Sequence, residues 1–395
     1  MNPVKILIDV VGGAALVFVL LLVLIVDLLT RTSPVPPSKN NLEVREITNV
    51  RVTGDAPKKL RMAVLTDPVE IRDVNTGNVV RTDVWDDMSK LLTKLGSGYQ
   101  HDQIRTKDLR DNPSRLDDID VLFFTCSDDK GKHELTDQLQ RFVGRGGILY
   151  ASDWRFDAVA AAFPDVVDAS KKGEGVKGKV TADVVDAGLR DALRSKSIEL
   201  NFDLPQWKTA AFGGPRVTVL MHGTYKKMRS NFDQEGAPAS APLLVKFPFG
   251  KGQVIFTSFH NEKNSGPMED KLLQYLVFAM VVAKAESQLQ EQVNQGGFSP
   301  QRSNLLSTPQ KNQSETKTFQ VKHAGPLRIA LSFNEGARLK LYLKAPDGKD
   351  WSKEFTAAAA LEVPQAQAGE WTYTITALDL PHENFPFSVS IYEKK

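Results

Sequence analysis

An uncharged apolar run at residues 10–26, bracketed by Asp9 and Asp27, restricts how this chain can fold more than any other feature. With its neighbours it spans residues 6–29, and a helix of that length, rising ~1.5 Å per residue, can cross about 30 Å of hydrocarbon. A segment in lipid must satisfy its own backbone hydrogen bonds, which favours a helix. A cleaved signal peptide is the alternative, but its apolar part usually covers only ~7–15 residues. We therefore predict an uncleaved, single-pass transmembrane helix at 6–29 and a location in the cell membrane.

Residues 30–57 follow this segment and contain Pro34, Pro36 and Pro37. Proline-rich segments favour an extended conformation and act as stiff spacers, so we predict a Pro-rich stalk. Lys5 and Arg31 place positive charge on both sides of the predicted helix. The charges therefore leave open which side of the membrane holds the soluble part of the chain.

Short apolar runs alternate with amphipathic stretches over residues 58–287. This alternation predicts an α/β domain with a mainly parallel sheet covered by helices on both faces. Apolar residues recur at helical spacing over 82–96, 133–144 and 266–290, where we expect helices. The predicted strands are 62–65, 119–124, 148–151, 217–220, 243–246 and 253–258.

After residue 287 the chain first becomes polar, and then its apolar residues recur at every second position. Residues 288–316 are rich in Gln, Asn, Ser and Gly, which predicts a flexible linker. Further on, apolar residues alternate with polar ones, as in Leu339, Leu341 and Leu343. Short alternating strands separated by Pro and Gly turns predict an all-β sandwich of jelly-roll type over 317–395.

Two segments of the α/β region resemble a known family. A strand at 119–124, a helix ending in Gly146-Gly147 and a strand at 148–151 are similar to the class I glutamine amidotransferase-like fold, which is flavodoxin-like. The segment from Gly250 to Glu262 then runs from a Gly-Lys-Gly turn through a strand into a His-x-Glu pair, as in that family. The resemblance implies that His260 is the general base and that Glu262 orients it.

The nucleophile of that family is a cysteine directly after the strand at 148–151, where this chain has Ser152-Asp153-Trp154. The single cysteine, Cys126, ends the preceding strand instead. An elbow also needs small neighbours, and Tyr150 and Trp154 are large. We therefore predict a degenerate, non-catalytic site. The alternative is a serine-type amide or ester hydrolase that uses Ser152, His260 and Glu262.

The C-terminal region resembles the bacterial pre-peptidase C-terminal-type jelly roll, on the segments Pro346-Asp347-Gly348 and Ala368-Gly369-Glu370-Trp371. Modules of that kind are usually non-catalytic and bind partners or surfaces. Some cysteine-free amidotransferase-like proteins act near sugar metabolism, so the resemblance leaves a carbohydrate-binding or carbohydrate-processing module open. Trp154 and Trp207 would then be its stacking platforms.

Composition excludes several other classes. Fifty basic against 48 acidic residues give a net charge of +2, which argues against nucleic-acid binding. One cysteine excludes an intrachain disulfide, and six scattered histidines show no metal-binding spacing, so we expect no metal site and no cofactor. An acidic cluster of Asp128, Asp129, Asp153 and Glu262 at the sheet edge could still hold a hard cation.

These patterns together predict a membrane-anchored scaffold or sensor that binds protein partners through a degenerate amidotransferase-like domain and a β-sandwich. Anchoring in a membrane raises the effective concentration of such modules for multivalent assembly. The sequence leaves the partner, the ligand and the oligomeric state open. The candidate ligand-binding residues are Cys126, Asp128, Ser152, Asp153, Trp154 and His260.

Overall fold

The structure is a computed structural model. It describes residues 42–49, 60–73, 75–127, 135–229, 234–264, 266–308, 310–334 and 336–394. The predicted transmembrane helix at 6–29 and most of the predicted stalk at 30–57 lie outside these residues. Within the described ranges, no helix is both long enough and apolar enough to cross a membrane.

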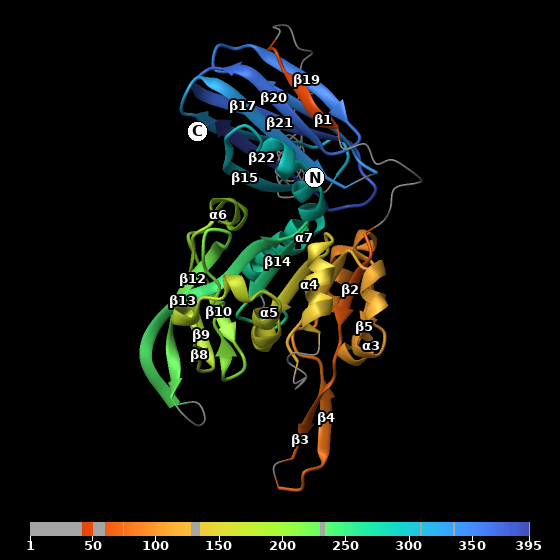
Figure 1. The fold of residues 1–395 in the computed structure, drawn as a ribbon, viewed down its shortest axis with the longest axis vertical. Helices are drawn as coiled ribbons and strands as arrows, with labels where there is room; N and C mark the ends of the chain where they lie inside the picture. The colour runs from red at the N-terminus through yellow and green to blue at the C-terminus, as the bar shows by residue number, and fades with distance from the viewer. Residues whose placement is uncertain are drawn as a thin grey trace, which may run out of the picture.

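The first domain contains a central sheet whose middle strands are parallel (Figure 1). Three of the predicted apolar runs form strands in which every residue is buried, because helices cover both faces. The hydrogen-bonded order is β14 (Gly252–Thr257), β7 (Ile148–Ser152), β6 (Val121–Phe124), β2 (Met62–Leu65) and β5 (His101–Ile104).

The other half of this sheet is antiparallel, so the sheet is mixed rather than mainly parallel as predicted. A short connection joins two long strands into a hairpin, and hairpin connections pair strands antiparallel. The runs at 217–220 and 243–246 predicted only short parts of these two strands. Beyond β14 the order is β13 (Gln234–Phe249), β12 (Thr218–Arg229), β9 (Gly178–Val184) and β10 (Ser197–Phe202).

Helices cover the sheet in two layers. One hydrophobic layer includes residues of α2 (Met88–Leu95), α6 (Ala187–Leu193) and α7 (Pro267–Val293). The opposite layer includes residues of α3 (Thr106–Asp111), α4 (Thr136–Gly144) and α5 (Phe156–Ala162). The helix expected at 82–96 is shorter because a strand occupies its first residues and the Asp87 side chain caps it.

Four short strands of this domain lie outside the main strand order of its central sheet. The hairpin of β3 (Val69–Arg72) and β4 (Val79–Asp83) projects from one end of the molecule (Figure 1). On the other side of the domain, β8 (Glu174–Gly175) pairs with β11 (Trp207–Lys208).

The turn from β13 into β14 explains the Gly-Lys-Gly sequence by packing. Gly250 has a φ of +56°, which favours glycine. A Cβ on Gly252 would lie 2.2 Å from the carbonyl oxygen of Gly147, so only glycine fits against this neighbouring turn. The predicted hairpin between β13 and β14 is confirmed.

The second domain is an all-β sandwich, as predicted for the C-terminal region. Its core includes Trp371, Leu341 and Ile329. One sheet has the order β1 (Arg45–Asn49), β20 (Ala359–Ala366), β17 (Gly325–Phe333), β22 (Phe385–Lys394) and β15 (Phe298–Thr308). The other has the order β16 (Ser314–Val321), β21 (Gly369–Asp379), β18 (Arg338–Lys344) and β19 (Asp350–Phe355).

Two edge strands of the sandwich lie outside the residues predicted for it. β1 lies within the predicted stalk and pairs with β20. β15 lies within the predicted flexible linker at 288–316 and pairs with β22 over its whole length. Both strands are held by backbone hydrogen bonds, which any side chain permits, so a polar composition did not reveal them.

Helix α7 joins the two domains directly (Figure 1). Its C-terminal half contributes Ala285, Leu289 and Val293 to a buried cluster with residues of the sandwich. The Arg328 guanidinium donates to the Val293 carbonyl at 3.0 Å, next to the end of the helix. The segment that leaves the α/β domain is therefore a packed helix.

Candidate functional site

The carboxyl ends of β6, β7 and β14 bring three side chains together. Cys126 follows β6, Asp153 follows β7 and His260 follows β14. One nitrogen, oxygen or sulfur atom from each lies within 4.8 Å of the others. All three residues are 1% exposed. Three of the candidates named from the sequence therefore meet in one buried cluster.

Asp153, rather than Ser152, occupies the elbow between strand and helix. Its φ is +46°, and a 3₁₀ turn (Asp153–Arg155) leads from it into α5. Ser152 has an extended backbone with φ of −133° and is the last residue of β7. A positive φ is uncommon outside glycine, and aspartate is among the residues that tolerate it.

The Ser152 hydroxyl is fully buried and already paired. It donates to Asp86 Oδ2 at 2.6 Å and accepts from the Cys126 backbone N–H at 3.0 Å. Among the described residues, no hydrogen bond joins Ser152 to His260. The hydroxyl therefore helps to hold the ends of β6 and β7 together.

His260 lies between two carboxylates. Its Nε2 is 3.3 Å from Asp153 Oδ2, and its Nδ1 is 2.9 Å from Asp203 Oδ1. Both contacts have ion-pair distances, although neither ring nitrogen has the direction of a normal hydrogen bond. The acid beside Nδ1 is thus Asp203, from the turn after β10.

Glu262, the acid that the family resemblance implies for this role, lies elsewhere. Its carboxylate binds Lys90, contacts Lys263 at 3.2 Å and accepts from the Asp87 backbone N–H at 3.3 Å. In the part of the chain that the structure describes, it makes no ion pair with His260.

The charges in the cluster favour a protonated His260. Burial lowers the pKa of His260, but Cys126, Asp153 and Asp203 raise it to well above its usual range. Burial raises the pKa of Asp203, but His260 outweighs this effect, so the net pKa is lowered. Burial raises the pKa of Asp153 and of the Cys126 thiol. The favoured state therefore pairs an imidazolium with the Asp203 carboxylate.

Asp86 holds the surrounding turns in place and was not predicted from the sequence. It is buried, and burial raises its pKa despite the opposing charge of His260. Its Oδ1 accepts the backbone N–H groups of Asn261 and Glu262 at 2.6 and 3.2 Å. Its Oδ2 accepts from the hydroxyls of Ser152 and Tyr150 at 2.6 and 3.3 Å.

The sequence contains a signal for Asp203 as a site residue but none for Asp86. Asp203 directly follows an alternating strand, Ser197–Phe202, which was not among the predicted strands although its pattern is present in the sequence. Asp86 lies between Trp85 and Asp87 within 82–96, where the sequence pattern predicted a helix, so nothing in the sequence pointed to a buried carboxylate in a turn.

The two candidate stacking tryptophans lie in different environments. Trp207 is 1% exposed, stacks on Phe202 at 4.0 Å and donates to the Val176 carbonyl, as a core residue does. Trp154 is half-buried and packs edge-on against Trp85 with ring centroids 5.2 Å apart. Asp128 and Asp129 lie outside the described residues.

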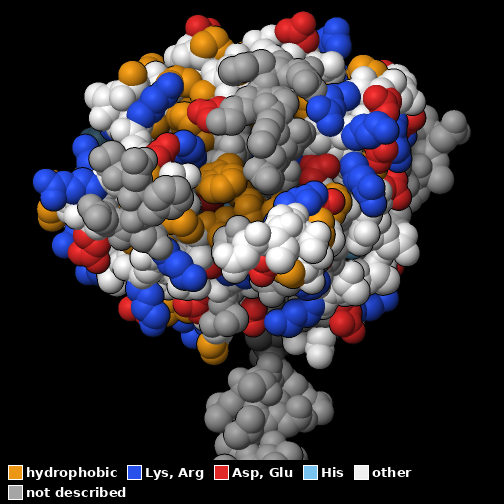
Figure 2. Space-filling view, turned by 90° about the horizontal axis from the view of Figure 1, so that it is seen from below, with side chains coloured by type: hydrophobic (Ala, Val, Ile, Leu, Met, Phe, Trp, Pro, Cys, Tyr) orange, Lys and Arg blue, Asp and Glu red, His pale blue; other side chains and the backbone are white. Residues whose placement is uncertain are grey.

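The face of the molecule from which the β3–β4 hairpin projects has an apolar centre. Figure 2 shows hydrophobic side chains gathered in a hollow near the middle of this face, with charged side chains around it. On the hairpin itself, Val79 and Val80 are 43% and 61% exposed. This face therefore presents apolar surface to its surroundings.

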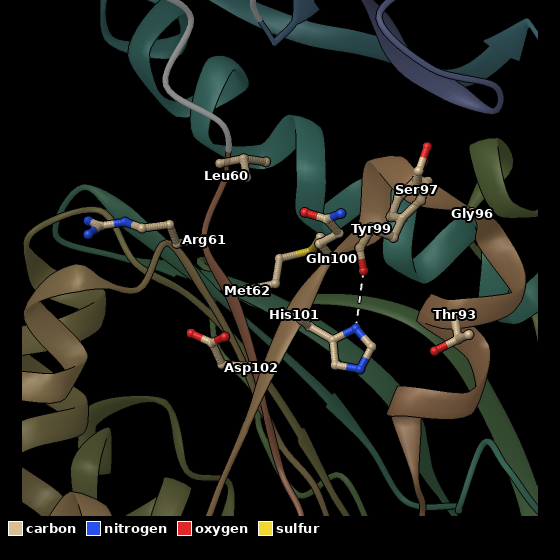
Figure 3. A pocket seen from close by; sticks show the side chains of 10 residues that line it. All are labelled: Leu60, Arg61, Met62, Thr93, Gly96, Ser97, Tyr99, Gln100, His101 and Asp102. Atoms are coloured by element: carbon tan, nitrogen blue, oxygen red, sulfur yellow. Dashed lines mark hydrogen bonds between the residues drawn. The ribbon is translucent and has the colours of Figure 1, made fainter.

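An open groove of about 700 Å³ lies at the opposite ends of the parallel strands (Figure 3). Met62 and His101, the first residues of β2 and β5, line it together with Tyr99. The His101 ring contacts the Tyr99 carbonyl at 3.1 Å. The groove contains neither Asp153 nor His260, so it is separate from the buried cluster.

No family model matches this chain, and no curated protein matches it. A ThuA-like protein from Bacteroides uniformis is 14% identical and has a TM-score of 0.38 over 58% of this chain and 94% of its own. A glutamine amidotransferase from Thermotoga maritima is 13% identical, with a TM-score of 0.31 over 59% of this chain and 85% of its own. Amidotransferase-like folds are thus among the structural neighbours. A ThuA-like protein from Parabacteroides merdae is similar at 12% identity and a TM-score of 0.37, over 55% and 88% of the two chains.

The raised pKa of His260 predicts how stability depends on pH. The folded state holds the His260 proton more tightly than the unfolded chain, whose histidine pKa is near 6.5. The resulting stabilisation is complete below pH 6.5 and is lost as the pH rises through the folded-state pKa. We expect His260→Gln to remove this decline, and urea denaturation at a series of pH values measures it.

The matched control is His323→Gln, which changes an exposed histidine in the sandwich. A chelating agent in all samples keeps trace metal from competing for the imidazole of His260. An unchanged decline in His260→Gln would mean that another group causes it.

Proposed function

We propose that this protein is a non-catalytic scaffold or sensor, anchored in a membrane through residues 6–29. In this proposal the amidotransferase-like domain and the β-sandwich bind protein partners. The family resemblance gives His260 the place of the base in an acyl-transfer site, but the Ser152 hydroxyl beside it has a structural role.

The observation that carries the proposal is the state of the Ser152 hydroxyl. It is fully buried and bonded to both Asp86 and the Cys126 backbone. A serine nucleophile must reach the substrate carbonyl and pass its proton to a base within hydrogen-bond distance. Ser152 is buried away from any substrate carbonyl, and its hydroxyl donates to the buried Asp86 and not to His260.

Apolar surface on the β3–β4 hairpin supports a role in partner binding. Val79 and Val80 are exposed on a two-stranded arm that projects away from the domain (Figure 1). The two residues are consecutive on β4, so they expose apolar side chains on both sides of the arm, where a partner can contact them. The packed junction of α7 with the sandwich would present both domains to a partner together.

The absence of hydrolysis is the first test. We expect the full-length chain in detergent to hydrolyse a p-nitrophenyl ester and a glutamine amide no faster than the Ser152→Ala variant. Serine hydrolases lose ~10⁴-fold or more of their rate when the nucleophile is removed. Turnover that disappears in Ser152→Ala would contradict the proposal and support the hydrolase.

Partner binding is the second test. Chemical crosslinking in native membranes should capture the same proteins with wild type and with Ser152→Ala, in the same amount per molecule of this protein. The Val80→Lys variant should lose much of this capture, whereas Thr82→Lys, an exposed change on the same hairpin, should not. Capture no greater than that of an unrelated protein on the same anchor would overturn the scaffold role.

A further inference from the structure

We propose that Cys126, Asp153 and His260 form a binding site for a divalent transition-metal ion of the zinc class. The ligand atoms are Cys126 Sγ, Asp153 Oδ2 and His260 Nε2. This site is independent of the proposed scaffold role, because it concerns the interior of the α/β domain and not its surface.

The distances fit tetrahedral coordination. Zinc binds nitrogen and oxygen at about 2.0–2.2 Å and sulfur at about 2.3 Å, so tetrahedral angles place ligand nitrogen and oxygen ~3.3 Å apart and oxygen and sulfur ~3.5 Å apart. Here Nε2 and Oδ2 are 3.3 Å apart, and Sγ and Oδ2 are 4.0 Å apart. All three ligand atoms lie within 4.8 Å of one another, so the Cys126 side chain must move toward the other two ligands to complete the geometry.

In both His260 and Asp153, the side-chain atom that would not bind the metal already contacts the surrounding chain. Asp203 Oδ1 lies 2.9 Å from His260 Nδ1, which leaves Nε2 for the metal. Asp153 Oδ1 accepts the Lys208 backbone N–H at 2.7 Å, which leaves Oδ2 for the metal. A carboxylate behind a histidine is the usual means by which proteins orient a metal-binding imidazole.

The buried imidazole also needs a better partner than the chain gives it. His260 is 1% exposed, and neither ring nitrogen makes a hydrogen bond of normal geometry. Buried polar atoms without such partners are uncommon and costly. A metal ion between Nε2 and Oδ2 would satisfy both atoms.

The mixture of donors selects the kind of ion. A thiolate and an imidazole favour zinc or cobalt, whereas magnesium and calcium require oxygen ligands. A thiolate and a carboxylate balance the two positive charges of the ion, and the thiol proton of Cys126 and the Nε2 proton of His260 are released to solvent on binding. Three protein ligands leave one coordination position for water or for a donor atom of a ligand.

Solvent comes close to this position. The Asp203 side chain, which contacts His260, is 21% exposed. The imidazole ring separates Asp203 from the metal position at Nε2, so the ion would lie beneath both His260 and the Asp203 turn.

Cobalt titration tests the site, because Cys126 is the single cysteine of the chain. We expect the full-length protein in detergent to bind one Co²⁺ per chain and to develop thiolate-to-cobalt charge-transfer absorption. Only Cys126 can supply that absorption, so its appearance identifies the ligand even if a variant fails to fold. Added Zn²⁺ should displace the cobalt and abolish the absorption, with the release of one equivalent of Co²⁺.

Variants separate ligands from supporting residues. Cys126→Ser should abolish the charge-transfer absorption, and His323→Gln, a change far from the cluster, should leave it intact. Asp203→Asn should keep the absorption but weaken binding about 10–100-fold, as loss of a supporting partner usually does. Wild-type protein that gives no charge-transfer absorption with excess Co²⁺ would overturn the proposal.

Discussion

We expect Asp86→Ala to lower the free energy of unfolding by about 4 kcal/mol. The change removes the acceptor of four donors in the interior, so several buried polar groups lose their partner at once. It also places alanine at a φ of +55°, a conformation that costs residues with a Cβ ~1–2 kcal/mol and that aspartate tolerates better. Urea denaturation monitored by tryptophan fluorescence measures the effect.

Two further variants identify its cause. Asp86→Asn keeps the shape and tolerates the positive φ, and the Ser152 and Tyr150 hydroxyls can turn to accept from the new amide. We therefore expect a loss of only about 1 kcal/mol for Asp86→Asn. Asp111→Ala removes an exposed carboxylate 4.0 Å from Lys107 and should change stability by less than ~0.5 kcal/mol. Equal losses in Asp86→Ala and Asp111→Ala would mean that the buried acceptor contributes little.

The second large effect concerns the junction of the domains. Leu289 on α7 is 1% exposed and belongs to a cluster with Phe298 and Tyr392 of the sandwich. Leu289→Asp loses this apolar contact and buries a carboxylate, so we expect the free energy of unfolding to fall by about 3 kcal/mol or more. We also expect the two domains to separate, which small-angle scattering detects as a larger radius of gyration.

Gln288→Asp is the matched control, because it adds the same charge at the neighbouring, exposed position of the helix. It should change neither the stability nor the scattering curve. If Leu289→Asp behaved like Gln288→Asp, the contact between α7 and the sandwich would not hold the domains together.

The sequence predicted those parts of the fold that depend on apolar patterns. The runs at 62–65 and 148–151 form strands, and the spacing of Leu272, Leu276 and Met280 marked helix α7 correctly. Edge strands β1 and β15 were not predicted, because each has a partner strand on one side only and their composition is polar. Backbone pairing leaves no periodic signal in such segments.

The site was predictable to a similar extent. The family resemblance named His260 and Asp153 as candidates, and Cys126 was noted because it ends the preceding strand. Side chains at the carboxyl ends of neighbouring strands meet at one edge of the sheet, and the structure brings these three together there. The same rule does not say which acid faces the imidazole, because Asp203 and Glu262 both follow strands. The choice depends on turn geometry, and Asp86 fixes that geometry from a position that the sequence pattern predicted to be helical.

The place of β1 has a mechanical consequence. This strand precedes the whole α/β domain in the chain, yet it pairs with β20 in the sandwich, between Arg45–Asn49 and the Ala359–Glu362 segment. Tension applied at the N-terminal side of residue 42 would therefore load the hydrogen bonds between β1 and β20 before it reached β2. The sandwich would bear the force, and the α/β domain would remain unstretched until that one edge strand had been pulled away.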